Sequence, residues 1–361
     1  MATRTPSNAA LLDEIRERLL RALPAAEPVD RAPHLGAAEP NDLIWNRSEL
    51  QRFRHLQRDY PERTGKFLRG CIVALSAAAH GAAISERVLD VAAAIELFQA
   101  WVLVHDDIED DSETRRGQPA LHRTVGMPIA LNVGDAMHLQ MWRLLHRSLA
   151  SQPTTLRAVL DEFGQMIERT AEGQHLDLSY VQSGRFEVSE AEYLDMVTRK
   201  TAYYTVVSPL RLGALLAGVA PAAEFSSAGV DLGVAFQIRD DVINLQRDEN
   251  FSAYGKEFAG DLYEGKRTLI LAHMLAAGEQ PQRDRVTALL SRQRRERSAD
   301  DVEEILDLIE HHGSLDYAQR VASRRAARGL ASLSTALADL PGQDAAAELL
   351  ELLAGVAERR H

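Results

Sequence analysis

The chain has 361 residues, of which 45% are hydrophobic and 26% are charged, and this is enough apolar material to enclose a large core. Its formal net charge of −12 argues against a nucleic-acid-binding protein or a protein that coats anionic membranes, because both need a basic surface. No run of residues approaches the roughly 18 to 20 apolar side chains of a membrane span, and residues 1–10 lack the pattern of a secretory signal. A single cysteine, Cys71, excludes an internal disulfide, so we expect a cytoplasmic protein in which Cys71 packs in the core.

The N-terminal segment differs in composition from the rest of the chain. Residues 1–40 contain five prolines and many alanines around one short helical stretch at 11–23, and this composition predicts a loosely attached leader. We expect no chemistry from the leader. The domain proper is expected to occupy residues 41–361.

Beyond the leader the hydrophobic periodicity is helical, and strand signals are scarce. Candidate capping boxes, in which a serine is followed three residues later by Gln, Glu or Asp, begin at Ser48, Ser189 and Ser298. Long apolar helices are expected at 88–108, 154–177, 193–217 and 229–245. Their frequent alanines and glycines permit close contact between helix backbones. The sequence therefore predicts an all-α fold, built as a single large helical bundle.

An aspartate cluster ends the first of these long helices. Asp106, Asp107 and Asp110 follow the strongly apolar stretch 97–104, and residues four apart on a helix share one face. Carboxylates in such surroundings cost free energy unless a partner such as a metal ion compensates them. The sequence Arg115–Arg116–Gly117 comes next, where a turn at the glycine can aim two guanidinium groups at phosphate oxygens.

A second cluster, Asp240–Asp241 with Asn244, lies at the end of the helix expected at 229–245, and Gln237 precedes it by one turn. If the two helices face each other across a cavity, the clusters form an all-oxygen cage for hard divalent cations that hold a diphosphate. Lys256 and Lys266 follow in an irregular, glycine-bearing segment that can fold over a bound anion.

The two clusters resemble the aspartate-rich motifs of the trans-isoprenyl diphosphate synthases, also called short-chain polyprenyl synthetases. Further elements are similar to those of this family and fall in the same order: Gly65–Lys66 with Arg69, Gln99, Gly173–Gln174 with Asp177, and Lys200–Thr201 with Tyr204. The resemblance covers about residues 45–330. One departure is Asn244, where many relatives have a third aspartate, and another is Gly70, where many have proline.

The resemblance implies a helical bundle of the isoprenoid synthase type around a central cavity, a homodimer, and Mg²⁺ as cofactor, with three ions. The implied substrates are isopentenyl diphosphate and an allylic diphosphate. The residues implied to bind magnesium are Asp106, Asp107, Asp110, Asp240, Asp241 and Asn244. Those implied to grip the allylic diphosphate are Arg115, Lys200 and Lys266, with Lys256 close by. Those implied to bind isopentenyl diphosphate are Lys66, Arg69, Gln99 and Arg116, and Thr201 and Gln237 are expected near the allylic cation.

The implied reaction is a head-to-tail condensation that begins with ionisation of the allylic diphosphate. Breaking the carbon–oxygen bond requires neutralisation of the leaving group, which Mg²⁺ and cationic side chains supply. The cation must meet an alkene before it meets water, so the site must be closed and mostly apolar. The released diphosphate is the nearest base, and we therefore expect His105 and His138 to be ordinary hydrogen-bonded helix residues.

Product length is expected to depend on the residues just before the first cluster. Val102 lies one turn before Asp106 on the same face, whereas Trp101 is rotated away from it. This pair looks like that of geranylgeranyl diphosphate synthases, which stop at twenty carbons, and the fifteen-carbon farnesyl diphosphate stays open as the other product.

Two other functions share part of this sequence pattern. A class I terpene cyclase shares the fold and the first cluster, but its second motif matches this chain poorly and it has no need for a group such as Lys66, Arg69 and Gln99. A non-catalytic partner subunit is expected to lack one cluster, and both are present here.

Overall fold

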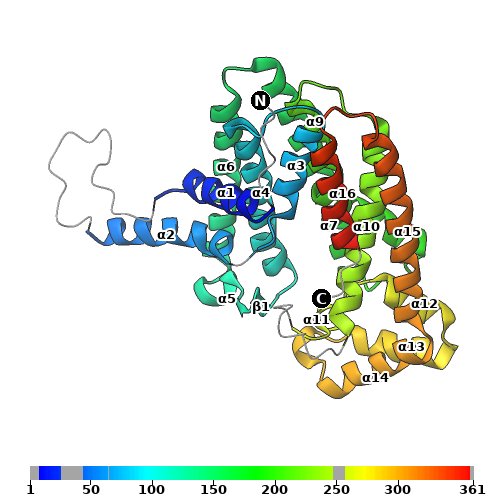
Figure 1. The fold of residues 1–361 in the computed structure, drawn as a ribbon. Coiled ribbons are helices and arrows are strands. Elements are labelled where there is room, and N and C mark those ends of the chain that lie inside the picture. The colour runs from blue at the N-terminus through cyan, green and yellow to red at the C-terminus, as the bar shows by residue number, and fades with distance from the viewer. Residues whose placement is uncertain (1–7, 26–43, 64, 247–256, 358–361) are drawn as a thin grey trace.

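The computed structural model describes residues 8–25, 44–63, 65–246 and 257–357 (Figure 1). These residues are almost wholly helical, which confirms the all-α prediction. The helices of the first half are α1 (Asn8–Ala22), α2 (Ile44–Glu62), α3 (Leu68–Ala79), α4 (Glu86–Glu109), α5 (Leu121–Val125), α6 (Met127–Leu149) and α7 (Pro153–Gln182). Those of the second half are α8 (Glu190–Val197), the π-helix η2 (Thr198–Val207), α9 (Ser208–Leu216), α10 (Ala223–Leu245), α11 (Gly260–Glu264), α12 (Leu269–Ala277), α13 (Gln280–Leu290), the 3-10 helix η4 (Arg294–Glu296), α14 (Ala299–His311), α15 (Ser314–Leu337) and α16 (Gln343–Ala357).

Helix α4 forms the centre of the N-terminal half of the bundle. It packs against α1, α3 and α6, and every residue from Val91 to Phe98 is buried. A helix that is apolar on all sides must be covered on all sides. By length and composition α4 is also the one helix in the described ranges that could cross a membrane, but 67% of that apolar window is buried inside the protein. Its apolar character is therefore accounted for by its place in the core.

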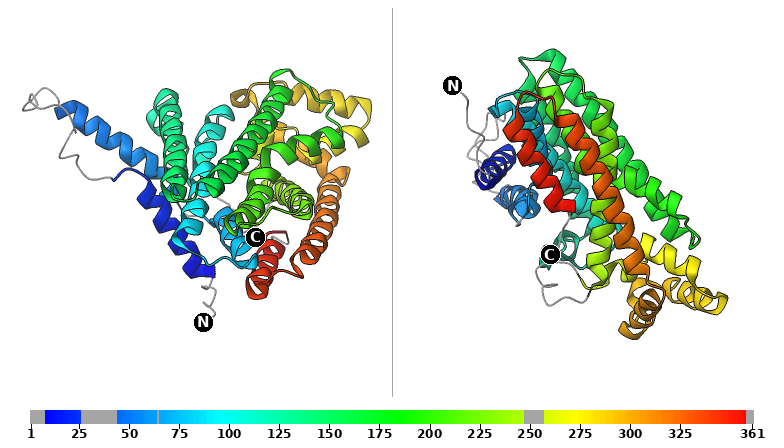
Figure 2. Two further views of the ribbon diagram at one scale, coloured as in Figure 1. Left: turned by 90° about the horizontal axis from the view of Figure 1, so that it is seen from above. Right: turned by 45° about the vertical axis from the view of Figure 1, so that its right-hand side comes forward.

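Helix α10 has the same central place in the C-terminal half, with α15 on one side and η2 on the other (Figure 2). The expected close approach of small residues is confirmed here. A Cβ atom on Gly233 would lie 2.5 Å from the Cα of Ala202, and one on Gly229 would lie 2.9 Å from the Cα of Val207. These distances are too short for any side chain, so glycine lets α10 and η2 pack directly backbone to backbone.

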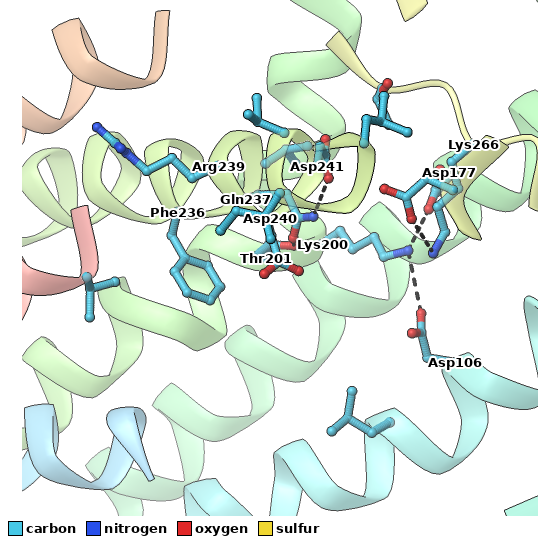
Figure 3. A pocket seen from close by; sticks show the side chains of 18 of the residues that line it. Asp106, Asp177, Lys200, Thr201, Phe236, Gln237, Arg239, Asp240, Asp241 and Lys266 are labelled. Carbon is cyan, nitrogen blue, oxygen red and sulfur yellow. Dashed lines mark hydrogen bonds and ion pairs between the residues drawn. The ribbon is translucent and has the colours of Figure 1, made fainter. Parts of the chain in front are cut away.

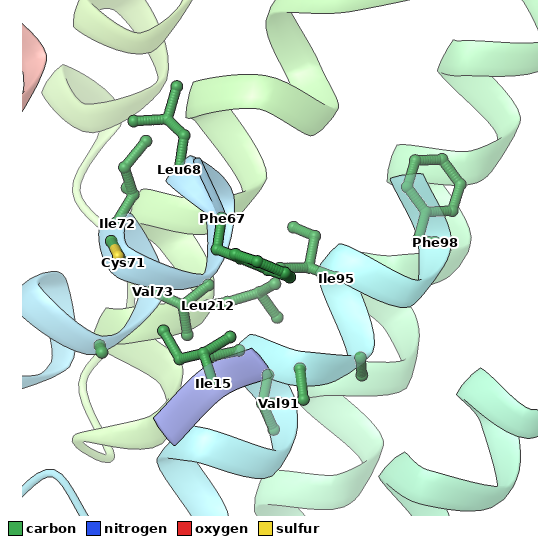
Figure 4. Close-up of a cluster of buried hydrophobic side chains, with 14 of the residues drawn as sticks. Ile15, Phe67, Leu68, Cys71, Ile72, Val73, Val91, Ile95, Phe98 and Leu212 are labelled. Atoms are coloured by element: carbon green, nitrogen blue, oxygen red, sulfur yellow. The ribbon is translucent and has the colours of Figure 1, made fainter. Parts of the chain in front are cut away.

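The prediction of a loosely attached leader is wrong for α1. Leu11, Ile15 and Leu19 recur every four residues along one face and are at most 1% exposed. They pack against α3 and α4, and Figure 4 shows Ile15 beside Val91 in the buried cluster. The amphipathic pattern of this helix outweighs the proline-rich composition of its surroundings, because an apolar stripe must find a surface to cover. Residues 1–7 and 26–40 of the expected leader lie outside the described residues.

The expected helices and caps are mostly confirmed. The capping boxes at Ser189 and Ser298 close the N-termini of α8 and α14 as expected. The box at Ser48 is wrong, because α2 already begins at Ile44 and Ser48 lies inside it. The helix expected at 193–217 is present as α8, η2 and α9 in succession, but a single-period reading of the sequence missed the wider π-helical turns in its middle.

Candidate functional site

A cavity of about 2380 Å³ runs between the two halves of the bundle. Its walls include residues of α3, α4, α7, η2 and α10, and the turn after α11 closes one end. Asp106 of α4 and Asp240 of α10 both line it (Figure 3). The structure therefore brings the two aspartate clusters to one cavity, as the sequence analysis expects. The other predicted site residues that line this cavity are Lys66, Arg69, Gln99, Arg115, Arg116, Lys200, Thr201, Gln237, Asp241 and Lys266.

Lys200 lies between the two clusters. Its Nζ is 3.6 Å from Asp106 Oδ1 and 2.5 Å from Asp177 Oδ2 (Figure 3). Burial alone would lower the pKa of Lys200, but the charges of Asp177, Asp106 and Asp110 together raise it above its usual value. The ammonium group is thus permanently charged, and it points into the cavity where a diphosphate would need a cation.

Asp107 has a different place from Asp106 and does not line the cavity. It is fully buried and accepts hydrogen bonds from the Tyr60 hydroxyl and from Arg115, whose Nε lies 2.9 Å from Asp107 Oδ1. Because successive helix residues point about 100° apart, Asp107 is directed into the core when Asp106 faces the cavity. The structure therefore does not support Asp107 as a metal ligand, and gives it the task of orienting Arg115 instead.

The turn that carries the two arginines is the one strand pairing among the described residues. β1 (Thr114–Arg115) pairs with β2 (Gln118–Pro119), and the two residues between them, Arg116 and Gly117, have φ values of +53° and +74°. Two successive positive φ angles are typical of a tight hairpin whose turn matches the twist of its strands. This turn holds the Arg115 guanidinium 3.3 Å from Asp106 and directs Arg116 to the same cavity.

Asp110 is the C-cap residue of α4 and forms an ion pair with Lys266, which follows α11. Its Oδ2 lies 2.8 Å from the Nζ of Lys266, which also lies 2.8 Å from Glu264 and 3.8 Å from Asp261. Burial raises the pKa of Asp110 to about 7, even though the charge of Lys266 opposes the change. Asp110 itself does not line the cavity, and it reaches the site through Lys266.

In the second cluster, Asp241 is fixed by two hydrogen bonds. Asp241 accepts one from the Tyr193 hydroxyl at 2.7 Å and one from Gln237 Nε2 at 2.7 Å. Gln237 in turn accepts a hydrogen bond from Thr201 Oγ1 at 2.9 Å. Burial and the nearby charge of Asp261 raise the pKa of Asp241 to about 7. The expected proximity of Thr201 and Gln237 is therefore present, and Asp240 and Asp241 line the same cavity as these two residues (Figure 3).

Asn244 is not available as a metal ligand in this structure. It is 1% exposed, its Oδ1 accepts the backbone N–H of Asp261 at 3.1 Å, and its Nδ2 lies 3.4 Å from the carbonyl of Glu257. The amide satisfies one donor and one acceptor of the following turn, a pairing that a carboxylate could make only in part. Its place corrects the expected metal role: Asn244 anchors the segment that carries Lys266. Lys256, the other cation expected in this segment, lies outside the described residues.

The π-helix η2 packs closely against Gly173 of α7. A Cβ atom on Gly173 would lie 2.1 Å from the backbone N of Lys200 and 2.5 Å from its Cα. Residues in such wide turns leave the regular i to i−4 hydrogen-bond ladder, and π-helical segments occur often at functional sites. The glycine expected from the Gly173–Gln174 element thus has a structural purpose, which is to admit the Lys200 backbone at the cavity wall.

A second group of cations lies near the start of α3. Arg69 Nη2 donates to Thr205 Oγ1 at 2.9 Å, and its guanidinium lies 4.4 Å from the centre of the Tyr204 ring. Lys66, Arg116 and Gln99 line the same part of the cavity surface. Such a set of forked and point charges suits a second diphosphate.

The apolar end of the cavity is lined by Trp101 and Val102. Trp101 lines the cavity as Val102 does, and its ring lies against α6. It stacks on His138 at 3.9 Å and 6°, and His138 Nε2 accepts a hydrogen bond from Trp142 Nε1 at 2.7 Å. The expectation for His138 is confirmed, since it packs and accepts a hydrogen bond, and burial lowers its pKa. His105 lies 3.4 Å from the Leu131 carbonyl.

Several residues that shape the site were not singled out for it from the sequence. Asp177 holds Lys200, and its spacing from Gly173–Gln174 was the available signal. Gln174 donates to Glu109 at 2.6 Å and so ties α7 to α4. Tyr60 and Tyr193, which hold Asp107 and Asp241, carry no signal in the sequence because each lies far along the chain from its partner.

The donor set of the cavity fits a hard divalent cation. Asp106 and Asp240 present carboxylate oxygens to it, and Mg²⁺ prefers carboxylates, phosphate oxygens and water. Within the described ranges no group of three or more Asp, Glu, His or Cys side chains converges closely enough to hold an ion. A metal ion in this cavity would therefore complete its coordination with oxygens of a bound diphosphate and water.

Comparison with known proteins places these features in a family. The model of the polyprenyl synthetase family matches residues 51–309. The chain is 34% identical over 284 residues to the geranylgeranyl diphosphate synthase of Sulfolobus acidocaldarius, covering 77% of this chain and 83% of that protein. It is 33% identical over 298 residues to the geranylfarnesyl diphosphate synthase of Aeropyrum pernix, covering 80% and 88%. The crystal structure of a geranylgeranyl pyrophosphate synthase from Corynebacterium glutamicum, complexed with isoprenyl diphosphate and magnesium, superposes with a TM-score of 0.83 at 27% identity, covering 98% of this chain and 100% of that one.

Proposed function

The chain belongs to the polyprenyl synthetase family, and we propose that it is a trans-prenyltransferase that joins isopentenyl diphosphate head to tail to an allylic diphosphate. The observation that carries this proposal is that one cavity is lined by Asp106 of the first cluster, by Asp240 and Asp241 of the second, by Lys200 between them, and by further cations near the start of α3. Two distinct cationic places suit two diphosphate substrates. The family also favours this activity over a terpene cyclase or a non-catalytic subunit.

The residues around Lys200 are proposed to bind the allylic diphosphate and to assist its departure. Arg115, Lys200 and Lys266 supply fixed positive charge, which Asp107, Asp177 and Asp110 hold in place. Positive groups that are already oriented stabilise charge as it develops, without any reorganisation during the reaction. Thr201 and Gln237 present weakly polar oxygens beside the expected position of the cation. The apolar walls around Phe98 and Val102 keep water from it.

Asp106 and Asp240 are proposed to hold magnesium, three ions in all, with Asp110 and Asp241 as neighbouring carboxylates. When bound, Mg²⁺ supplies neutralisation of the leaving diphosphate. The relative from Corynebacterium glutamicum was crystallised with magnesium and isoprenyl diphosphate, and this supports the same use of metal here.

Lys66, Arg69, Gln99 and Arg116 are proposed to bind isopentenyl diphosphate. Arg69 lies on α3, Gln99 on α4 and Arg116 in the β-turn, and Lys66 lies just before α3. The alkene of this substrate is thereby brought toward the allylic cation. Its addition forms the new carbon–carbon bond and a new carbocation, which loses a proton to the released diphosphate.

The product is proposed to be the twenty-carbon geranylgeranyl diphosphate. The support comes from Trp101 and Val102, which wall the apolar end of the cavity, and from relatives named as geranylgeranyl diphosphate synthases. A cytoplasmic location is proposed with it, because a single buried cysteine suits a reducing compartment.

The test is a chain-length assay with Mg²⁺, isopentenyl diphosphate and allylic primers of five, ten and fifteen carbons. We expect a twenty-carbon product from each primer, and pyrophosphate release only when isopentenyl diphosphate is present. The variants D106N and D240N should each lower kcat by about a hundredfold or more, since each removes a charge that faces the leaving group.

The matched control is D111N, because Asp111 follows the same cluster but has a side chain that is 65% exposed and pairs with Arg123. Its turnover should stay near that of the wild type. Pyrophosphate release without isopentenyl diphosphate would indicate a cyclase instead, and unchanged turnover in D106N and D240N would refute the roles of the aspartates.

We also propose that the protein is a homodimer formed through α6. This helix exposes Met127, Leu131 and Leu139, which lie four and eight residues apart on one face and are 45% to 58% exposed. Exposed apolar side chains that gather on one face mark an interaction surface.

A further inference from the structure

Helix α3 begins without a side-chain cap of its own. The residue before it, Phe67, has a left-handed backbone (φ 42°, ψ 37°) and no hydrogen-bonding side chain. The first backbone N–H groups of any helix have no partner within the helix, and leaving them unpaired in the interior is costly. Leu68, Arg69 and Gly70, the first three residues of α3, are all buried, so a partner must come from elsewhere in the fold.

That partner is Glu96, which projects from α4. Its Oε1 accepts the backbone N–H of Gly70 at 2.8 Å, and its carboxylate also interacts with the backbone N–H of Arg69. Glu96 is 5% exposed and does not line the cavity. Figure 4 shows the place of this contact, where Phe67 at the start of α3 lies against Ile95 of α4.

Gly70 makes this contact possible in two ways. A Cβ atom there would lie 3.0 Å from the carbonyl of Ala92 and 3.3 Å from Cγ of Glu96 itself, so a larger residue would crowd the contact between α3 and α4. Glycine also has an N–H to donate, which the proline common in relatives lacks. The departure of this sequence at position 70 therefore coincides with a hydrogen bond that a proline could not make.

Glu96 also lies among the cations proposed to bind isopentenyl diphosphate. Burial raises the pKa of Glu96, and the positive charges of Arg69 and Arg116 oppose this change. Burial and the neighbouring arginines lower the pKa of Arg116, and the negative charge of Glu96 opposes this change. Arg69 is thus fixed twice: Glu96 holds its backbone, and Thr205 with Tyr204 holds its guanidinium.

From these contacts we propose that Glu96 is a positioning residue for the isopentenyl diphosphate subsite. It caps α3 from outside and so sets where Lys66 and Arg69 lie before the substrate arrives. This inference rests on the proposed function, because it assigns a task to Glu96 within the same site.

The test separates positioning from stability. E96A removes the whole carboxylate. E96D keeps the carboxylate, but its side chain is one methylene group shorter and so holds the group farther from the start of α3. Both should raise the KM for isopentenyl diphosphate at least about tenfold, while kcat and the KM for the allylic substrate change by no more than about threefold. E96Q should restore the KM to within about threefold of the wild type, because its amide oxygen can accept the same N–H groups.

Glu162 offers the matched control. It is likewise a buried carboxylate, 4% exposed, but it pairs with Ser208 at 2.7 Å and Arg211 at 2.9 Å, away from the cations of α3. E162A should lower Tm and leave the KM for isopentenyl diphosphate unchanged. An equal rise in the KM of both substrates in E96A, or the same rise in E162A, would overturn the positioning role.

A binding measurement distinguishes this inference from the proposed function. Calorimetric titration of each variant with isopentenyl diphosphate alone should give a Kd that rises in E96A and E96D and recovers in E96Q. If the wild-type protein binds isopentenyl diphosphate but makes no prenyl diphosphate longer than the primer, the proposed function is refuted. The series of Kd values would still decide the role of Glu96. Identical Kd values across the series would refute that role even if elongation is observed.

Discussion

Neighbouring acidic residues in the two clusters perform different tasks. Asp106 and Asp240 face the cavity, whereas Asp107 is fully buried against Arg115 and Tyr60, and Asn244 is bonded to the backbone of Asp261. A buried carboxylate or amide is stable only with charged or hydrogen-bonding partners, and Asp107 and Asn244 both have them. Sequence motifs therefore identify the cluster, but the direction of each side chain decides which member can meet a ligand.

The lone cysteine gives a prediction at this scale. Cys71 is 2% exposed, and burial, with the negative charge of Glu96, raises the pKa of its thiol to about 12. The group is an acid whose raised pKa keeps it protonated well above neutral pH, and only the thiolate reacts with alkylating reagents. Native protein at about pH 8 should therefore take up no iodoacetamide, and one equivalent should react once denaturant is added, as followed by mass spectrometry. Rapid alkylation of the native protein would show that Cys71 is reachable and ionised.

Glycines of α7 and α10 let these helices contact the backbone of η2, the element that carries Lys200. Gly173 of α7 lies against the backbone of Lys200, and Gly233 of α10 lies against Ala202, so that η2 is held between two other helices by direct backbone contact. The contact with Gly173 places the backbone of Lys200 directly against α7. The element that carries the central lysine is thus shaped by its neighbours as much as by its own sequence.

Gly173 provides the test at the scale of the element. G173A would put a methyl group 2.1 Å from the Lys200 nitrogen, so the backbone of η2 must move. We expect a loss of about 1–3 kcal/mol in the free energy of unfolding, as for other overpacked sites. We also expect at least about a tenfold fall in kcat/KM for the allylic substrate, because small misplacements of a positioning group are costly.

The control for this variant lies on the same helix. A Cβ atom on Gly164 meets nothing within 4 Å, so G164A should keep full activity and stabilise α7 by about 0.5–1 kcal/mol. Chemical denaturation and steady-state kinetics measure both effects. Equal behaviour of the two variants would mean that the contact between Gly173 and Lys200 does not position the lysine.

In the whole molecule, two groups of helices built around α4 and α10 enclose the cavity between them. Each half has its own buried cluster, and α1 completes the first by covering α3 and α4. The outer face of α6 leaves three large apolar side chains uncovered, those of Met127, Leu131 and Leu139. Covering that face with a second copy would remove the exposed patch.

The dimer proposal is tested with a charge placed on that face. L139E should shift the protein from dimer to monomer in light scattering coupled to size-exclusion chromatography, because a buried unpaired carboxylate disfavours the interface. V219E is the control, since Val219 is also apolar and 46% exposed but lies after α9 rather than on α6. A wild-type protein that elutes as a monomer, or a dimer that L139E leaves intact, would contradict the proposal.

The sequence by itself determined the helical class, the starts of α8 and α14, and many of the residues that line the cavity, because periodicity, capping and motif spacing are local properties of the chain. Only the tertiary structure decided that α1 belongs to the core, that Asp107 and Asn244 support the site from behind, and that Trp101 forms part of the cavity wall. These outcomes depend on which surface lies opposite each side chain. That surface is supplied by helices far along the chain, as when Tyr60 meets Asp107 and Glu96 meets Gly70, and no local pattern records it.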